Sequence, residues 1–173
     1  MTKQEVSDFA EQIAQQYNPQ GLSPFPFENI QELNKDLNIY LAALDDQISG
    51  AIGFNDNIFT IFINSNKPKT RQHFTTAHEV GHYFLHQDLI KKQQVLVDSD
   101  QYLDGNNFLY RLDSAEPTVV ETDANNFAAS LIMPETLVKK AWESINDIEE
   151  CAKIFNVSQI AMRVRLERLT LIT

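Results

Sequence analysis

Hydrophobic residues follow two different periods along this chain. Near the N-terminus, apolar side chains recur every three to four positions over residues 4–17, which predicts an amphipathic helix. A loop rich in proline and glycine follows, and a second short helix is expected over residues 27–37. Three runs rich in β-branched and aromatic residues then predict strands at 39–43, 48–54 and 58–64.

Short polar segments separate the three predicted strands. Asp45 to Gln47 and Asn55 to Asn57 have the composition of turns that join antiparallel neighbours, so a small three-stranded antiparallel meander is expected. The third strand is apolar on both faces, which predicts that it is covered on both sides.

Helical periodicity returns after Pro68. Thr70 is the expected N-cap of a helix over residues 71–87, and residues 88–117 are polar with little period, which predicts a long loop with one short helix. Further helices are expected over residues 118–133, 134–145, 147–155 and 159–169. The pattern is therefore that of an α+β protein whose last two helices, joined by a short turn, resemble a helix-turn-helix.

Composition limits the kind of protein this can be. The 173 residues are 43% hydrophobic and 22% charged, which suits one compact domain with a buried core. The net charge of −10 disfavours binding to nucleic acids or to anionic membrane surfaces. The single cysteine, Cys151, rules out an intramolecular disulfide. The first residues lack the apolar segment of a signal peptide and no run is long enough to span a bilayer, so a cytoplasmic location is expected.

One motif carries recognisable chemistry. His78-Glu79-Val80-Gly81-His82 places two histidines four residues apart on a predicted helix, so both imidazoles lie on one face and can bind one zinc ion. Glu79 is offset from that face by about 100°. It can therefore lie beside the metal and act as a general base toward a water molecule.

A catalytic zinc site needs a third protein ligand, and three residues of the helix after Thr118 are relevant to it. Glu121 can supply that ligand, while Asn125, four residues later on the same face, can accept a hydrogen bond from a ligating histidine. From position alone Glu121 can equally complete a capping box with Thr118, and Asp123 is a second candidate ligand.

Other residues near the motif have simpler interpretations. His86 can in principle join the site, but it and His73 are expected to be ordinary histidines at the exposed ends of the helix. Tyr83, Tyr102 and Tyr110 are candidates for stabilising an oxyanion, and nothing in the sequence selects one of them.

Two segments together resemble a known family. The first is Arg71 to His86, RQHFTTAHEVGHYFLH, and the second starts at Glu121 with the pattern E-x-x-A-N-x-F-A-A-x-L-I-M-P. They resemble the ImmA/IrrE family of zinc metallopeptidases, and the resemblance runs from residues 38–39 to the end of the chain. It implies a gluzincin-like site with His78, His82 and Glu121 as zinc ligands. Family members often have a longer acidic side chain where this chain has Asp123.

The resemblance also implies a fold and a role. The expected fold is zincin-like, with a small antiparallel three-stranded sheet packed on the HExxH helix. Residues 1–145 would form the metallopeptidase domain and residues 146–173 the helix-turn-helix-like helices packed on it. The implied activity is cleavage of a protein substrate, a helix-turn-helix repressor of a phage, mobile element or stress locus.

Alternatives to this function remain at the level of sequence. A non-catalytic metal-containing regulator that binds a transcription factor would keep the same fold, as would a zinc hydrolase for small substrates. Arg163, Arg165 and Arg168 lie on the last helix, but direct DNA binding is not expected in so acidic a chain. For a peptidase, residues 58–64 are the expected free sheet edge on which a substrate strand would pair.

Overall fold

The described helices and strands confirm the α+β class that the hydrophobic pattern predicts. The structure is a computed structural model, and it describes residues 1–99 and 118–173. Its helices are α1 (Lys3–Tyr17), α2 (Phe27–Leu33), α3 (Lys69–Leu85), α4 (Gln87–Gln93), α5 (Val119–Ile132), α6 (Glu135–Ile145), α7 (Ile148–Phe155) and α8 (Gln159–Arg168). Its strands are β1 (Leu37–Ala42), β2 (Ile48–Asn55), β3 (Ile58–Asn64) and β4 (Val95–Ser99).

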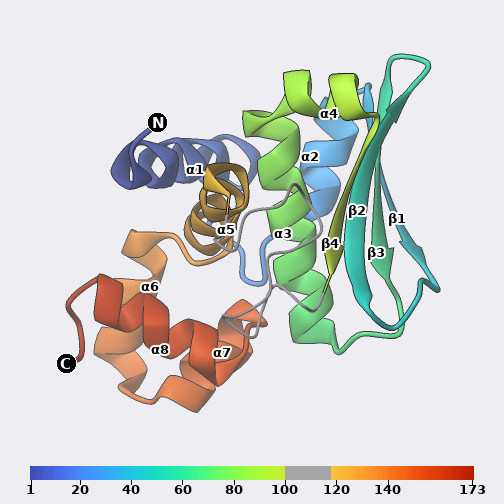
Figure 1. Ribbon diagram of the computed structural model, residues 1–173. Helices are drawn as coiled ribbons and strands as arrows, with labels where there is room; N and C mark the ends of the chain where they lie inside the picture. The colour runs from blue at the N-terminus through green and yellow to red at the C-terminus, as the bar shows by residue number, and fades with distance from the viewer. Residues whose placement is uncertain (100–117) are drawn as a thin grey trace.

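The described elements form layers around α3 (Figure 1). The sheet lies on one side of α3, which packs against β2 and β3. On the other side of α3 lies α5, which in turn packs against α1. Helices α6, α7 and α8 group at one end of this arrangement. Helix α3 is thus covered on two sides, and ten of its residues are buried.

The sheet is mixed and has four strands, so the prediction of a three-stranded antiparallel meander is wrong. The strand order is β1-β3-β2-β4, with β1 parallel to β3 and β2 antiparallel to both β3 and β4. Only β2 and β3 form the expected hairpin. Its two central residues, Asp56 and Asn57, have φ of 50° and 61°, as a tight two-residue turn requires.

A buried asparagine explains why β1 and β2 do not pair. The side-chain amide of Asn64, at the end of β3, donates to the carbonyl oxygens of Asp45 (3.0 Å) and Ile48 (2.7 Å). These bonds hold the connection between β1 and β2 across the end of β3. Strand β1 therefore pairs with the far side of β3, a long-range outcome that turn composition does not encode.

Strand β3 differs from its prediction in two ways. Phe59, Ile61 and Ile63 are buried under the helices, whereas Phe62 on the opposite face is 40% exposed, so only one face is covered. Because β3 lies between β1 and β2, it has no free edge, and the expected pairing of a substrate with residues 58–64 is excluded.

Several helix boundaries are confirmed and others shift. Helix α5 begins after Thr118, whose hydroxyl accepts from the Glu121 N–H at 3.3 Å, and α7 begins after Asp147, which caps the Glu150 N–H. Helix α3 starts two residues earlier than expected, with Pro68 rather than Thr70 at its N-cap. The predicted loop over residues 88–117 contains most of α4, which is the expected short helix, and the unexpected strand β4. Residues 100–117 lie outside the described residues.

The last helix is tied to the rest of the molecule by a buried arginine. Arg165 of α8 is 7% exposed and donates to the Met133 carbonyl and to the Glu11 carboxylate, both at 2.9 Å.

The proposed division of the chain at residue 145 stays a prediction. Among the described helices, none combines the length and the hydropathy that a bilayer-spanning helix needs.

Candidate metal centre

Three metal-ligating side chains converge where α3 and α5 cross. His78 and His82 lie one turn apart on α3, and Glu121 lies in the first turn of α5. All three are buried, with exposed fractions of 3%, 0% and 3%. Among the described residues these three make up the only group of this kind, and Asp123, the alternative ligand, does not belong to it.

The separations of the three potential donor atoms suit a single metal ion. The Nε2 atoms of His78 and His82 are 3.0 Å apart, and Glu121 Oε2 lies 3.2 Å and 3.6 Å from them. Tetrahedral ligands at zinc distances of about 2.0–2.1 Å would be separated by roughly 3.3 Å. The group is therefore compatible with a metal ion.

The protonation of the group favours cation binding. Burial lowers the pKa of His82 to about 3, so this imidazole is neutral near pH 7. Burial of Glu121 opposes its charged form, but hydrogen bonds with His78 and His82 outweigh that effect and hold the pKa of this carboxyl well below its usual range. Neutral imidazole and carboxylate are the forms that ligate metals.

Each histidine also contacts a side chain through its other ring nitrogen. The Nδ1–H of His78 donates to Asn125 Oδ1 at 3.0 Å, which leaves the lone pair of Nε2 directed toward Glu121 and His82. The Nδ1 atom of His82 lies 3.1 Å from the Nδ1 atom of His86. His86 was expected to be an exposed histidine, but it is half-buried and orients a residue of the site.

Gly81 allows α5 to come close enough for Glu121 to reach the histidines. A Cβ atom at Gly81 would lie 3.1 Å from Phe127 Cδ1 and 3.3 Å from the Ala124 carbonyl oxygen. This role of Gly81 is not predicted from the sequence above. A glycine inside a helical pattern was the available signal, since it often marks close packing.

Glu79 lies on α3 where this helix packs against β2 of the sheet. Its side chain is fully buried, and a Cβ atom at Gly50 of β2 would lie 3.3 Å from Glu79 Oε1. This role of Gly50 is also not predicted from the sequence above. The available signal was a glycine inside a predicted strand, which often marks a close approach of another segment. Glu79 is thus next to the ligand group in the chain without belonging to it.

The other aromatic and histidine candidates have separate surroundings. Tyr83 is 4% exposed and its hydroxyl donates to Asp36 Oδ1 at 2.8 Å, just before β1. Tyr102 and Tyr110 lie outside the described residues. The ring of His73 packs on Phe27 with centroids 5.1 Å apart, so it is half-buried rather than exposed as expected.

Comparisons with known proteins support the sequence motifs. A sequence model of the peptidase family described as the IrrE N-terminal-like domain, Peptidase_M78, matches residues 34–167. No curated protein matches the sequence. A Mycobacterium tuberculosis transcriptional regulator has a similar structure, with a TM-score of 0.58 and 17% sequence identity over 96% of this chain and 52% of that one. The chain thus spans about half the length of that regulator, and at this identity the likeness concerns the fold alone.

Proposed function

The chain belongs to the IrrE N-terminal-like domain family of metallopeptidases, and on that premise we propose that it is a zinc-dependent endopeptidase that cuts a protein substrate. The observation that carries the proposal is the convergence of His78, His82 and Glu121 within 4.8 Å of one another, with the buried Glu79 next to them in the chain. A purely structural role would leave no reason to gather three metal ligands in a protein interior.

We assign the ligands of the metal to His78, His82 and Glu121. Asn125 and His86 orient the two imidazoles by hydrogen bonding to their Nδ1 atoms. When bound, zinc supplies a Lewis acid that polarises a carbonyl group and makes a water molecule more acidic.

Glu79 is the proposed general base. Its carboxylate takes a proton from the attacking water and passes that proton to the nitrogen of the leaving amine, so that the peptide bond is hydrolysed without a net change at Glu79. Gly50 keeps side-chain atoms away from the carboxylate on the β2 side, so that Glu79 can lie between the helix and the sheet.

The substrate is expected to be a folded regulator with an extended cleavable segment. Among the described strands, β4 is the sheet edge on the side of Gly50, since Gly50 pairs with Asp98. We propose β4, in place of β3, as the edge on which the segment pairs. The resemblance of the two motifs to the ImmA/IrrE family suggests a helix-turn-helix repressor, which fits the expected cytoplasmic location.

Co-expression with helix-turn-helix repressors encoded near this protein tests the proposal. We expect a repressor to be cut by the wild type and not by Glu79→Gln, with a loss of about 10²–10⁴-fold in rate and unchanged zinc content. If both proteins bind the repressor and neither cuts it, the chain is a metal-containing binding protein instead. Cleavage by both would assign the base to another residue.

A further inference from the structure

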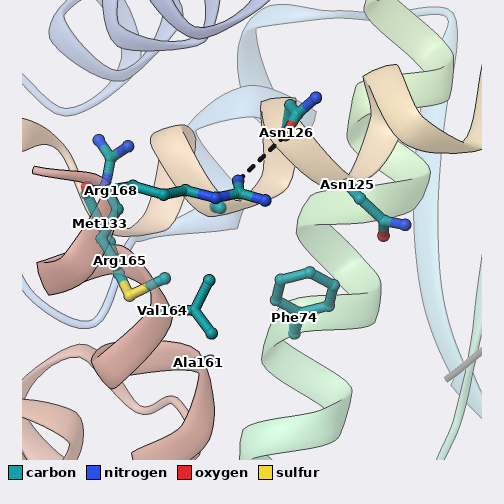
Figure 2. A pocket seen from close by; sticks show the side chains of 9 residues that line it. Phe74, Asn125, Asn126, Met133, Ala161, Val164, Arg165 and Arg168 are labelled. Carbon is teal, nitrogen blue, oxygen red and sulfur yellow. Dashed lines mark hydrogen bonds between the residues drawn. The ribbon is translucent and has the colours of Figure 1, made fainter. Parts of the chain in front are cut away.

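A pocket of about 190 Å³ lies between α3, α5 and α8 (Figure 2). Its apolar walls are made by Phe74, Ala129, Met133, Ala161 and Val164. Val164 is 41% exposed, and Ile160, one turn earlier on α8, is 77% exposed. The apolar surface therefore continues from the pocket onto the outside of α8.

Asn125 connects the pocket to the metal centre. It lines the pocket, and the same side chain accepts the hydrogen bond from His78. Phe74, which also lines the pocket, lies one helical turn before His78. An extended peptide advances about 3.3 Å per residue. A peptide with its reacting carbonyl at the metal centre would therefore present a side chain to this pocket within a few residues of the scissile bond.

A positively charged side chain, that of Arg168, lies at the pocket. In Figure 2 the side chain of Arg168 extends across it toward Asn126, and its guanidinium donates to Asn126 Oδ1 at 3.1 Å. Within residues 1–99 and 118–173, no carboxylate forms an ion pair with Arg168, although the chain has a net charge of −10. The nearby Arg165 differs, because it is buried and pairs with Glu11. Arg168 is thus exposed and available to an anionic group.

We propose that this pocket binds one large apolar side chain of the peptide substrate, while a neighbouring carboxylate of the peptide pairs with Arg168. Apolar cavities of about 150 Å³ accept a benzene-sized group, so a pocket of 190 Å³ suits the side chain of leucine, methionine or phenylalanine. The inference rests on the proposed peptidase function and adds the substrate class: segments with a large apolar residue beside an acidic one near the cut.

Small probes separate the apolar and the ionic parts of this site. N-acetylleucine carries both groups, N-acetylleucinamide lacks the carboxylate, and N-acetylglycine lacks the side chain. Each is titrated into the full chain, with and without zinc, while amide resonances of Ala129, Ala161 and Val164 are followed by NMR. We expect shifts at these residues with millimolar affinity for N-acetylleucine, about three- to fivefold weaker binding of the amide, and no shifts with N-acetylglycine.

Two variants and their matched controls locate the site. Ala161→Leu, which fills the pocket, should weaken the binding of N-acetylleucine at least about tenfold. Ala43→Leu, on the exposed segment after β1, should leave this affinity unchanged. Arg168→Gln should remove the preference for N-acetylleucine over its amide, whereas Arg163→Gln, at an exposed position of α8, should keep it. Circular dichroism and thermal unfolding check that each variant is folded.

The results decide the inference separately from the peptidase function. Absence of shifts at the pocket, or shifts that Ala161→Leu leaves unchanged, would overturn it even if a repressor is cut. Pocket shifts that change as expected in both Ala161→Leu and Arg168→Gln support the inference even if no substrate is cut. Where cleavage occurs, digestion of an unfolded carrier protein should place a large apolar residue at one fixed position, and Ala161→Leu should move that preference to smaller residues.

Discussion

Glu121 performs two tasks with different atoms. Its backbone N–H bonds the Thr118 hydroxyl and so helps to start α5, while its carboxylate faces His78 and His82. The sequence left two uses of this carboxylate open, a capping box and a metal ligand. Only the position of α3 distinguishes the capping role from the ligand role, because the first turn of a helix has the same local geometry for either role.

Removal of the Glu121 carboxylate should release the metal. We expect Glu121→Ala to bind zinc at least about tenfold more weakly than the wild type, since the site loses one of three protein ligands. Zinc content after dialysis, measured by atomic absorption, checks this. Asp123→Ala is the matched control on the same helix and should keep full stoichiometry. The reverse pattern would make Asp123 the ligand.

His73 should make the protein sensitive to acid. Burial lowers its pKa from 6.5 to about 4, so the unfolded chain takes up a proton at a higher pH than the folded protein does. The contribution of His73 to the free energy of unfolding is fully present above about pH 6.5 and is lost as the pH falls toward 4. We expect the wild type to lose about 1–2 kcal/mol more than His73→Phe between pH 7.5 and pH 5, measured by urea unfolding. Equal losses would exclude His73 as the cause.

At the scale of elements, the contact between β2 and α3 depends on Gly50. A Cβ atom there would lie 2.6 Å from Thr75 Cγ2 and 3.2 Å from the Phe62 carbonyl oxygen. Helix α3, which carries the HExxH motif, could then no longer pack at its present distance from the sheet. The hydrophobic pattern predicts that this helix covers the strands, but not how closely.

Gly50→Ala should therefore be harmful despite the small change. We expect a loss of about 1–3 kcal/mol in the free energy of unfolding and a slower cleavage rate, since Glu79 borders the same space. Gly53→Ala is the control in the same strand, because its nearest atom would be 3.4 Å away, an ordinary contact. Thr75→Ser, which removes Cγ2, should restore part of the stability in the double variant. No rescue would place the strain elsewhere.

At the scale of the whole molecule, Arg165 joins three helices that are far apart in sequence. It lies on α8 and bonds the end of α5 at Met133, Ser130 within α5, and Glu11 of α1. In the sequence it appeared as one of three arginines on a helix-turn-helix-like segment. Its burial removes it from any surface that could bind DNA, because a guanidinium with these partners cannot also contact a phosphate.

Loss of this arginine should destabilise the molecule as a whole. We expect Arg165→Met to lower the free energy of unfolding by about 2–3 kcal/mol, because polar partners, including the partly exposed Glu11, are left without their donor. Urea unfolding followed by far-UV circular dichroism measures the loss. Arg163→Met, at an exposed position two residues earlier, should change stability by no more than about 0.5 kcal/mol. Similar effects of the two variants would contradict the structural role.

The sequence by itself determined the elements and the local geometry within each of them. Periodicity placed most helices and three strands, and the spacing of His78 and His82 put both on one face of a helix, because side-chain direction within an element follows from its own repeat. Tertiary structure alone decided that β1 pairs with β3, that Gly81 admits α5, and that Glu121 meets the two histidines. These outcomes depend on which distant apolar faces bury one another, and no local pattern specifies the partner.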